Sequence, residues 1–407
     1  MIEKKAILVI VDGVGDRAVK DGKTPLQLAN KPILDDLALK GATGLMSTIG
    51  IGIIPGSDTA HLALFGYDPK VYYRGRGPFE ALGVGINLKE GDVAFRCNFA
   101  TVNEKFQVID RRAGRLKDEG IELAKSLQGI KINGIEIIFE SSTEHRGVLV
   151  LRGEGLSSAV SDTDLHSSQV TPPLKSKPLE DSEEAKKTSR VVNEFVKRSW
   201  EILSSHPLNK ERRKEGKFPA NIVLTRGAGA YQRVDSLKEK YGFSSCCIAG
   251  AALYKGVAKY VGMQIVNVKG ATGRVDTDIE AKARAAKEAL RKFDFVFLHI
   301  KGADNASHDG NLEDKLLMIE RVDRLAEILR EEDVWLIITA DHSTPISIKR
   351  HSSDPVPVLI HGNGIRRDKV HLFDEVSVAS GCLGHFTGVQ LNKMIVDLMG
   401  CGHMVGS

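Results

Sequence analysis

The hydrophobic pattern of the chain alternates between short apolar runs and longer amphipathic segments. Ala6–Val11 is almost wholly apolar, as expected for a parallel strand that is covered on both faces. Pro32–Lys40 and Ser57–Leu64 are predicted to be helices, and residues 44–48 a short strand. Strand–helix alternation of this kind is typical of an α/β sheet with helices on both faces.

The last third of the chain repeats this alternation. In chain order it predicts a strand at 263–268, a helix at 276–292, a strand at 293–299, a helix at 312–330, and strands at 334–339 and 356–360. The predicted strands are rich in apolar residues, so we expect them in the same buried sheet as the first strand. Polar residues that follow these strands matter most, because open α/β sheets bind ligands at the carboxyl ends of their strands.

The middle of the chain has a different pattern. It predicts a hairpin at 92–102 and 106–110, a helix at 118–127, strands at 135–140 and 147–152, a long loop at 153–182, a helix at 182–204 and a strand at 221–225. The loop is assigned from its Ser, Thr, Pro and Asp content. We therefore expect two domains: an α/β core formed by residues 1–72 and 251–407, and an inserted α+β domain formed by residues 73–250.

Composition is that of an ordinary globular protein, with 42% hydrophobic and 27% charged residues among 407. The formal net charge is +4, and no concentrated basic stripe argues for a nucleic-acid or membrane partner. The short basic run at 210–217 is more simply a solvated helix end. No apolar stretch approaches the length of a membrane span. Five scattered cysteines without a CxxC pair indicate a reducing compartment, so we expect a cytoplasmic protein.

Carboxylates and imidazoles lie after three of the predicted strands or in the loops that follow, at Asp12, Asp304, His308, Asp341, His342 and His351. Taken singly, each has an ordinary explanation as a turn residue, a helix cap or a surface histidine. Together they would meet at one edge of the sheet, and a mixed set of carboxylate and imidazole ligands suits Mn²⁺, Zn²⁺ or Co²⁺. If the loop after Asp304 turns helically, His308 lies on the same face and can bind the same ion. Gly13 leaves room for a close backbone turn after Asp12.

Ser57 is the candidate nucleophile. It lies at the predicted N-terminus of a helix, where free backbone N–H groups and the helix dipole favour a phosphate. A metal ion in contact with its hydroxyl oxygen would lower the pKa of the hydroxyl and make it nucleophilic. Simple N-capping by Ser57 or Asp58 is the alternative, and it does not exclude catalysis.

These residues, in this order, resemble the alkaline phosphatase superfamily. Further segments are similar to the archaeal-type cofactor-independent phosphoglycerate mutases, namely FGYDP at 65–69, YRGRGPFEALG at 73–83, DRRAGR at 110–115 and RGAG at 226–229. The resemblance runs over nearly the whole chain. It implies an alkaline-phosphatase-like core sheet with helices on both faces, plus an inserted α+β domain that covers the metal site and binds the substrate.

The resemblance also implies a reaction. The enzyme, an isomerase, would interconvert 3-phosphoglycerate and 2-phosphoglycerate in glycolysis and gluconeogenesis, without bisphosphoglycerate and through a phosphoserine at Ser57. One metal ion would be held by Asp12, Ser57, Asp341 and His342, and the other by Asp304, His308 and His351. Two divalent cations are therefore expected as cofactors, with Mn²⁺ preferred over Zn²⁺, Co²⁺ or Mg²⁺, and phosphoglycerate is the expected small-molecule partner.

Substrate-binding residues are predicted from charge, because glycerate carries a carboxylate that a bidentate arginine matches well. The candidates are Arg111, Arg115, Arg146 and Arg226, with Lys175 and Lys269 as point charges. His145 is a candidate for shuttling the hydroxyl proton. Surface charge is the alternative for each basic residue. His385 is interpreted as an ordinary histidine at the start of a helix.

Two other functions fit parts of the pattern. A metallophosphatase or another phosphomutase on the same core would use the same ligands, and release of phosphate in each turnover would distinguish the phosphatase. A non-catalytic binding protein with this fold is disfavoured, because the serine and the ligand set are intact.

Overall fold

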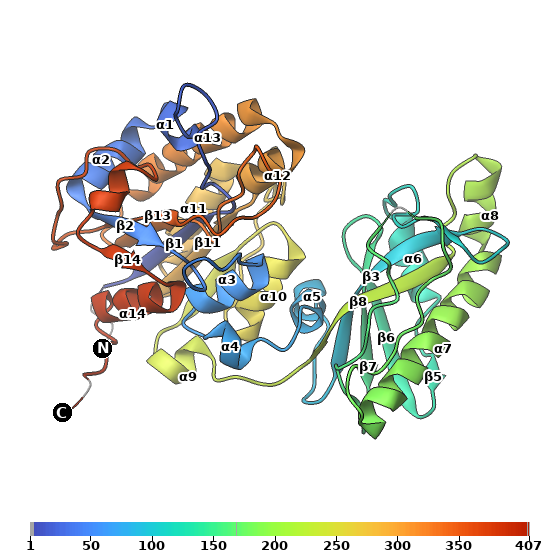
Figure 1. Cartoon of the computed structure of the whole chain (residues 1–407). Coiled ribbons are helices and arrows are strands. Elements are labelled where there is room, and N and C mark those ends of the chain that lie inside the picture. The colour runs from blue at the N-terminus through green and yellow to red at the C-terminus, as the bar shows by residue number, and fades with distance from the viewer. Residues whose placement is uncertain (1–3, 168, 405, 407) are drawn as a thin grey trace. The chain divides into compact units, whose positions relative to one another are not determined.

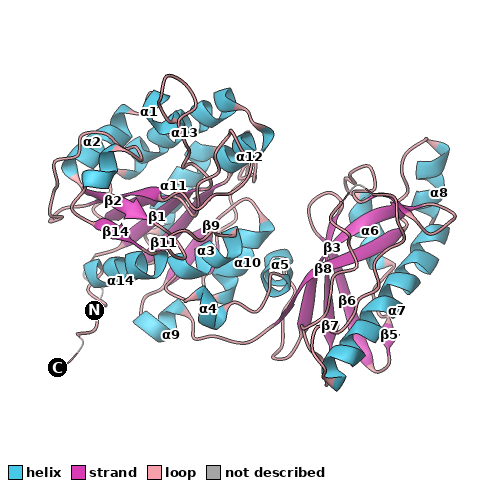
Figure 2. Ribbon diagram, viewed as in Figure 1, coloured by secondary structure: helices cyan, strands magenta, loops and turns pink. Residues whose placement is uncertain are grey.

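The computed structural model describes residues 4–167, 169–404 and 406 of the chain. The chain forms two compact units, one from Met1–Tyr73 with Val234–Ser407 and the other from Arg74–Arg233 (Figure 1). Each unit has its own sheet (Figure 2). Within the described residues, no helix combines the length and the apolar character that a membrane crossing needs.

The first unit is built on an eight-stranded mixed sheet. Its strands, in spatial order, are β10 (Gln264–Ile265), β9 (Ser245–Ile248), β11 (Phe295–Ile300), β1 (Ala6–Val11), β12 (Trp335–Thr339), β13 (Val356–His361), β2 (Ala42–Met46) and β14 (Gly384–Phe386). β1 is parallel to both β11 and β12, whereas β13 is antiparallel to β12 and β2. All residues of β1, β11 and β12 are buried, which explains their nearly unbroken apolar sequences.

Helices cover both faces of this sheet (Figure 2). One layer comprises α1 (Pro25–Leu28), α2 (Pro32–Lys40), α11 (Ile279–Ala289), α12 (Gly302–Asp309) and α13 (Leu312–Leu329). The other comprises α3 (Ser57–Leu64), α4 (Pro69–Tyr72), α9 (Leu237–Tyr241), α10 (Ala252–Tyr260) and α14 (Gly388–Leu398), and the 3-10 helix η1 (Ser377–Ser380) contacts β2. Thr24 and Thr387 begin α1 and α14 with capping boxes, which satisfy the free N–H groups of the first turn.

The second unit is an antiparallel sheet covered by helices. Its strands are β3 (Val93–Val102), β4 (Val108–Asp110), β5 (Lys131–Ile132), β6 (Ile135–Ser141), β7 (Arg146–Arg152) and β8 (Ile222–Ala230), in the order β4-β3-β7-β6-β5 with β8 also paired to β3. Its helices are α5 (Gly77–Val84), α6 (Glu119–Lys125), α7 (Glu183–Ser205) and α8 (Pro207–Lys214). Phe95 and Phe99 of β3 share a buried core with Phe195 of the amphipathic helix α7.

The chain segments at the entrance and the exit of the second unit lie against each other. A Cβ added at Gly75 would lie 2.1 Å from Ala228 O, and one added at Gly229 would lie 2.6 Å from Arg74 O. Gly75 also has a φ of +104°, a backbone conformation that favours glycine. The two glycines therefore permit the close approach of these segments.

The expected α/β fold with helices on both faces of its sheet is confirmed. β1, α2 and α3 begin and end at the expected residues. The strand expected at 263–268 is wrong in extent, because β10 comprises Gln264–Ile265. The expected domain boundary at residue 250 is wrong too: residues 234–250 belong to the first unit, where β9 pairs in parallel with β11. The sequence pattern did not reveal α5, α10 or α14.

A buried ion pair ties together the loops that follow β1 and β12. Lys315 of α13 and Asp16 are both buried, with Nζ 2.8 Å from Oδ2. The same ammonium group donates to a backbone oxygen in each loop, those of Gly15 and Thr344, at 3.4 and 3.1 Å. The ion pair therefore fixes both loops relative to the sheet, and with them the carboxylates that follow β1 and β12.

We expect Lys315→Met to lower the free energy of unfolding of the first unit by about 3–5 kcal/mol, because Asp16 would keep a buried charge without its partner. The measurement is urea unfolding followed by Trp335 fluorescence, in a Trp200→Phe background so that the first unit alone is reported. The double variant Lys315→Met/Asp16→Asn, which also removes the carboxylate charge, should recover part of the loss. A loss below about 1 kcal/mol would contradict a structural role for the pair.

Candidate active site

Three parallel strands bring the sequence-predicted residues to one edge of the first unit's sheet. Ile10 of β1 lies level with His299 of β11 and with Thr339 of β12. The backbone N–H of Asp12 donates to Ile300 O at 2.9 Å. The loops after these strands therefore begin side by side at the carboxyl edge, where ligands bind in open α/β sheets.

Asp12, Asp341 and His342 form one compact group, with ligand atoms within 4.8 Å of one another. The His342 Nε2 atom is 3.4 Å from Asp12 Oδ1 and 3.2 Å from Asp341 Oδ2, and all three side chains are buried. Asp12 Oδ1 and Asp341 Oδ2 have no hydrogen-bond partner among the described residues. Buried carboxylate oxygens without donors need a compensating partner, and a divalent cation fits this group.

Ser57 lies beside this group. It is the first residue of α3, whose N-cap is Gly56, and no side-chain capping bond forms at this helix end. The Ser57 Oγ atom instead lies 3.3 Å from His342 Nε2. The N-capping alternative for Ser57 is therefore wrong, and its hydroxyl group points to the candidate ligands.

Asp304, His342 and His351 form a second compact group. The segment after β11 is helical, as α12, which confirms the expected placement of Asp304 and His308 on one helix face. The His308 and His351 Nε2 atoms lie 3.3 and 3.7 Å from Asp304 Oδ1. His308 lies at the rim, with its side chain 41% exposed. His342 belongs to both groups, whereas the resemblance assigned it to one metal ion alone.

The hydrogen bonds of two rim histidines define which ring nitrogen is free. His308 Nδ1 lies 2.9 Å from Lys349 O, and His351 Nδ1 lies 2.9 Å from Pro55 O. A carbonyl oxygen can only accept, so Nδ1 carries the proton in each neutral ring. The Nε2 atoms that face Asp304 are then free to bind a cation, the usual arrangement of metal-binding histidines.

Burial and like charge dominate the electrostatics of the site. Burial, together with Asp12 and Asp304, raises the pKa of Asp341 well above its usual value. Burial also acts to raise the pKa of Asp12, but the Lys301 ammonium group and neighbouring imidazoles outweigh it and hold this pKa well below its usual value. Burial lowers the pKa of His342 to about 3, so its ring is neutral near pH 7, the form that binds metals.

Two residues that sequence reasoning missed hold the outer oxygens of these carboxylates. Tyr254 and Lys301 donate to Asp12 Oδ2, and Lys301 also donates to Asp304 Oδ2 at 2.7 Å. Lys301 follows β11 directly, so its position at a strand end could have predicted it as a site residue. Tyr254 lies in α10, remote in sequence from the other site residues, and carries no local signal.

Gly13 permits the close approach of these loops, as expected. It has a φ of +66°, and a Cβ added there would lie 2.8 Å from Asp304 Cβ. A larger residue would push apart the loops that follow β1 and β11.

Two further histidines differ from expectation. His385 lies in β14 rather than at a helix start, with Nε2 2.8 Å from Ser47 Oγ. His61, which was not a predicted ligand, is fully buried, and its Nδ1 lies 2.6 Å from Ser57 O. The His61 Nε2 atom has no hydrogen-bond partner among the described residues. His61 therefore supports the backbone at Ser57.

The second unit carries a group of cationic side chains on one face of its sheet. Arg96 of β3 lies opposite Arg226 of β8, and Asn98 of β3 lies opposite Arg146 of β7, so all four start from the same face. Arg96 Nε, Arg226 Nε and Asn98 Oδ1 are buried without a hydrogen-bond partner among the described residues. Burial and the nearby Arg76 lower the pKa of Arg96 to about 9. Crowded cations with free donors fit an anionic ligand.

The other predicted basic residues have different surroundings. Arg111 donates from Nε and Nη2 to the two carboxylate oxygens of Asp164, at 2.6 and 2.7 Å. His145 is buried, and its Nδ1 has no hydrogen-bond partner within the described part of the chain. The exposed candidates are Arg115, Arg146 and Lys175, together with Lys269, which belongs to the first unit.

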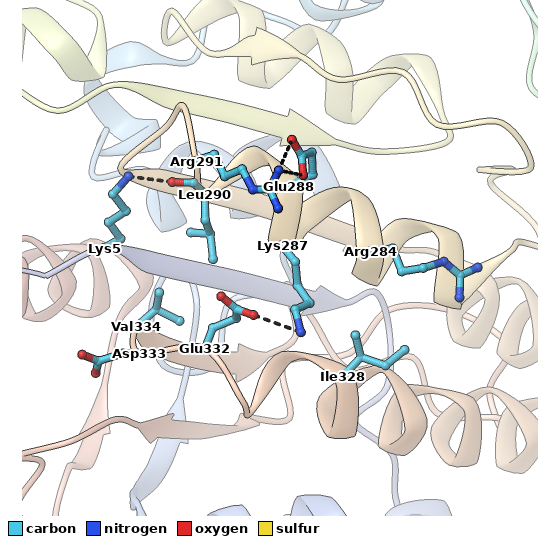
Figure 3. Close-up of a pocket in the computed structure, with 10 residues that line it drawn as sticks. All are labelled: Lys5, Arg284, Lys287, Glu288, Leu290, Arg291, Ile328, Glu332, Asp333 and Val334. Carbon is cyan, nitrogen blue, oxygen red and sulfur yellow. Dashed lines mark hydrogen bonds and ion pairs between the residues drawn. The ribbon is translucent and has the colours of Figure 1, made fainter.

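The pocket drawn in Figure 3 lies at the other end of the first sheet. It is lined by residues that precede β1, β11 and β12, among them Lys5 and Val334. Two ion pairs link charged groups of its lining, Lys287 with Glu332 and Arg291 with Glu288, both at 3.0 Å. Because ligands of open α/β sheets bind at the opposite strand ends, this pocket is not a candidate for the active site.

Comparisons with known proteins agree with this geometry. A family profile described as 2,3-bisphosphoglycerate-independent phosphoglycerate mutase matches residues 38–209. The protein named 2,3-bisphosphoglycerate-independent phosphoglycerate mutase 1 from Methanocaldococcus jannaschii is 48% identical over 100% of both chains. A 2,3-bisphosphoglycerate-independent phosphoglycerate mutase from Methanococcus aeolicus is 46% identical, over 99% of this chain and 100% of the Methanococcus protein.

Two solved structures also match over nearly the whole chain. A protein from Pyrococcus horikoshii matches with a TM-score of 0.87 and 37% identity, over 100% of both chains. The cofactor-independent phosphoglycerate mutase from Thermoplasma acidophilum matches with a TM-score of 0.73 and 36% identity, over 98% of this chain and 100% of its own. With this identity over its whole length, the chain belongs to the 2,3-bisphosphoglycerate-independent phosphoglycerate mutase family.

Proposed function

We propose that this chain interconverts 3-phosphoglycerate and 2-phosphoglycerate without 2,3-bisphosphoglycerate, through a phosphoserine at Ser57. The observation that carries the proposal is the position of Ser57 Oγ, 3.3 Å from the His342 Nε2 atom that belongs to both ligand groups. Family membership supports an isomerase over a phosphatase.

A cytoplasmic location stays a prediction from the cysteine pattern.

The two ligand groups are proposed to hold two divalent cations. One would be bound by Asp12, Ser57, Asp341 and His342, and the other by Asp304, His308 and His351, with His342 near both. Mn²⁺ is the proposed ion because it accepts carboxylate and imidazole ligands together, and Zn²⁺, Co²⁺ and Mg²⁺ are the alternatives. When bound, such cations neutralise charge on the phosphoryl group and on the attacking and leaving oxygens.

The chain itself contributes position and the exclusion of water. Ser57 begins α3, so backbone N–H groups at this helix end can donate to a phosphate that approaches its hydroxyl group, apart from that of Thr59, which donates to Asp58 Oδ1 at 3.0 Å. Ser57 is 8% exposed and lies among buried side chains. Restricted access of water favours return of the phosphoryl group to glycerate over hydrolysis of the phosphoserine.

The second unit is proposed to bind the glycerate part of the substrate. The Nε atoms of Arg96 and Arg226 are buried donors without a hydrogen-bond partner among the described residues, although Arg96 Nε lies 3.8 Å from Glu80 Oε1, and such donors suit a carboxylate. Arg111 is already bound to Asp164 and would present a fixed guanidinium group. Burial and the nearby Arg146 lower the pKa of His145 to about 4, so the ring is neutral near pH 7. Its Nδ1, which has no hydrogen-bond partner among the described residues, is available to take part in proton transfer.

Replacing the nucleophile should abolish isomerisation without abolishing cation binding. We expect Ser57→Ala to lose conversion of 3-phosphoglycerate in a ³¹P NMR assay, by about 10⁴-fold or more, and to bind Mn²⁺ more weakly. The matched control is Ser343→Ala, another buried serine, whose hydroxyl group bonds to Pro355 O. Conversion retained by the Ser57 variant would rule out the phosphoserine route.

The pH dependence of Mn²⁺ binding should follow His308. A hydrogen bond with Asp304 raises the pKa of His308 above its usual value, so a cation must displace its proton as the pH falls, whereas His342 with a pKa of about 3 stays neutral. We expect the affinity for Mn²⁺ to fall from about pH 8 to about pH 6. His308→Gln should flatten this dependence in titration calorimetry, and an unchanged slope would exclude His308 as the titrating ligand.

Removing the Arg226 guanidinium group should weaken substrate binding selectively. Arg226→Gln is expected to raise KM for 3-phosphoglycerate about tenfold or more, the cost of one hydrogen bond to a charged group. Mn²⁺ affinity should stay unchanged. Arg190→Gln, on the exposed side of α7, is the control and should keep the parental KM. An unaltered KM in Arg226→Gln would mean that this residue does not contact the substrate.

A further inference from the structure

Lys301 has an ammonium group that bridges the two ligand groups. Its Nζ lies 3.2 Å from Asp12 Oδ2 in one group and 2.7 Å from Asp304 Oδ2 in the other. Nζ also donates to the Tyr254 hydroxyl group at 2.9 Å, and that hydroxyl group donates to the same Asp12 oxygen. Because Lys301 directly follows β11, the sheet fixes its position.

The carboxylates around this ammonium group carry more negative charge than the group can neutralise. Asp12, Asp304 and Asp341 are at most 2% exposed, so water screens their repulsion poorly. Lys301 contacts two of these three carboxylates through their outer oxygens, while the inner oxygens of Asp12 and Asp341 stay unpartnered among the described residues. The ammonium group therefore compensates part of the charge without occupying the inner positions.

We propose that Lys301 is an internal cation that stands in for metal charge in the metal-free protein and thereby weakens the affinity of the site for divalent cations. The proposal rests on the two-cation site of the proposed function. A bound divalent cation would share Asp12 and Asp304 with the ammonium group, and the two positive charges would repel each other at short range. Lys301 thus stabilises the empty site and limits how tightly cations are held.

Another buried lysine provides a matched control. The Lys282 side chain is fully buried, and its Nζ donates to a backbone oxygen, His299 O, at 3.0 Å. The structure gives Lys282 no ion pair with the carboxylates of the site in the described residues. Loss of Lys282 should therefore destabilise the protein equally with and without cations.

The test compares Lys301→Met with Lys282→Met in the full chain, using Mn²⁺ alone as the probe. For Lys301→Met we expect a larger fall of Tm in EDTA than in saturating Mn²⁺. By linkage, titration calorimetry without substrate should then give a Kd for Mn²⁺ about tenfold below the parental value. Lys301→Arg, which keeps the charge, should show neither change, and Lys282→Met should lower Tm equally in both conditions.

The outcomes separate this proposal from its alternatives. An equal fall of Tm in both conditions, or an unchanged or higher Kd in Lys301→Met, would overturn it and leave Lys301 as a positioning residue. If Lys301→Met does not fold in EDTA but folds with Mn²⁺, the proposal stands; failure in both conditions moves the same test to Lys301→Gln, which keeps a donor but no charge. Failure of the proposed function would appear separately, as absent isomerisation with intact Mn²⁺ binding.

Discussion

The first unit depends on one electrostatic constraint: three carboxylates are held together at a sheet edge that water hardly reaches. Asp12, Asp304 and Asp341 repel one another there, and a buried charge without a partner is costly. The fold tolerates the repulsion because parallel strands and the Lys315–Asp16 ion pair leave the loops little freedom to move apart. The remaining imbalance then favours the binding of cations over the opening of the loops.

In the second unit it is positive charges that lie close together, and a sheet again holds them in place. Arg96 and Arg226 are fixed on paired strands, and their Nε atoms are buried without hydrogen-bond partners among the described residues. Strand register, rather than loop anchoring, keeps these guanidinium groups together. In both units a rigid sheet holds like charges at close range, and a ligand of opposite sign would supply the missing compensation.

The sequence predicted the residues that follow parallel strands, because a strand end is visible in the hydrophobic pattern and parallel strands share one edge. This is why Asp12 and His342 could be expected in the same site. Tyr254 could not, since its contact with Asp12 arises from packing of α10 against the sheet. Arg96 was missed because a single charged residue inside an apolar strand indicates an edge or a solvated face as readily as a binding site.

The predicted domain boundary at residue 250 was wrong for a related reason. Ser245–Ile248 is a four-residue strand, too short to show a periodic pattern, and its place beside β11 is set by pairing across the sheet. Long helices such as α7 were found because their amphipathic pattern extends over several turns. Short elements that are stabilised by tertiary contacts leave little trace in the local sequence.

The contact of Gly75 with Ala228, and of Gly229 with Arg74, has an evolutionary consequence. A module whose two ends touch can be inserted into a single loop of a host domain, because the host elements on either side need not move. Gene rearrangements could therefore exchange such a module for one with another ligand preference and leave the host sheet intact. The pair of glycines marks the seam at which such an exchange would be tolerated.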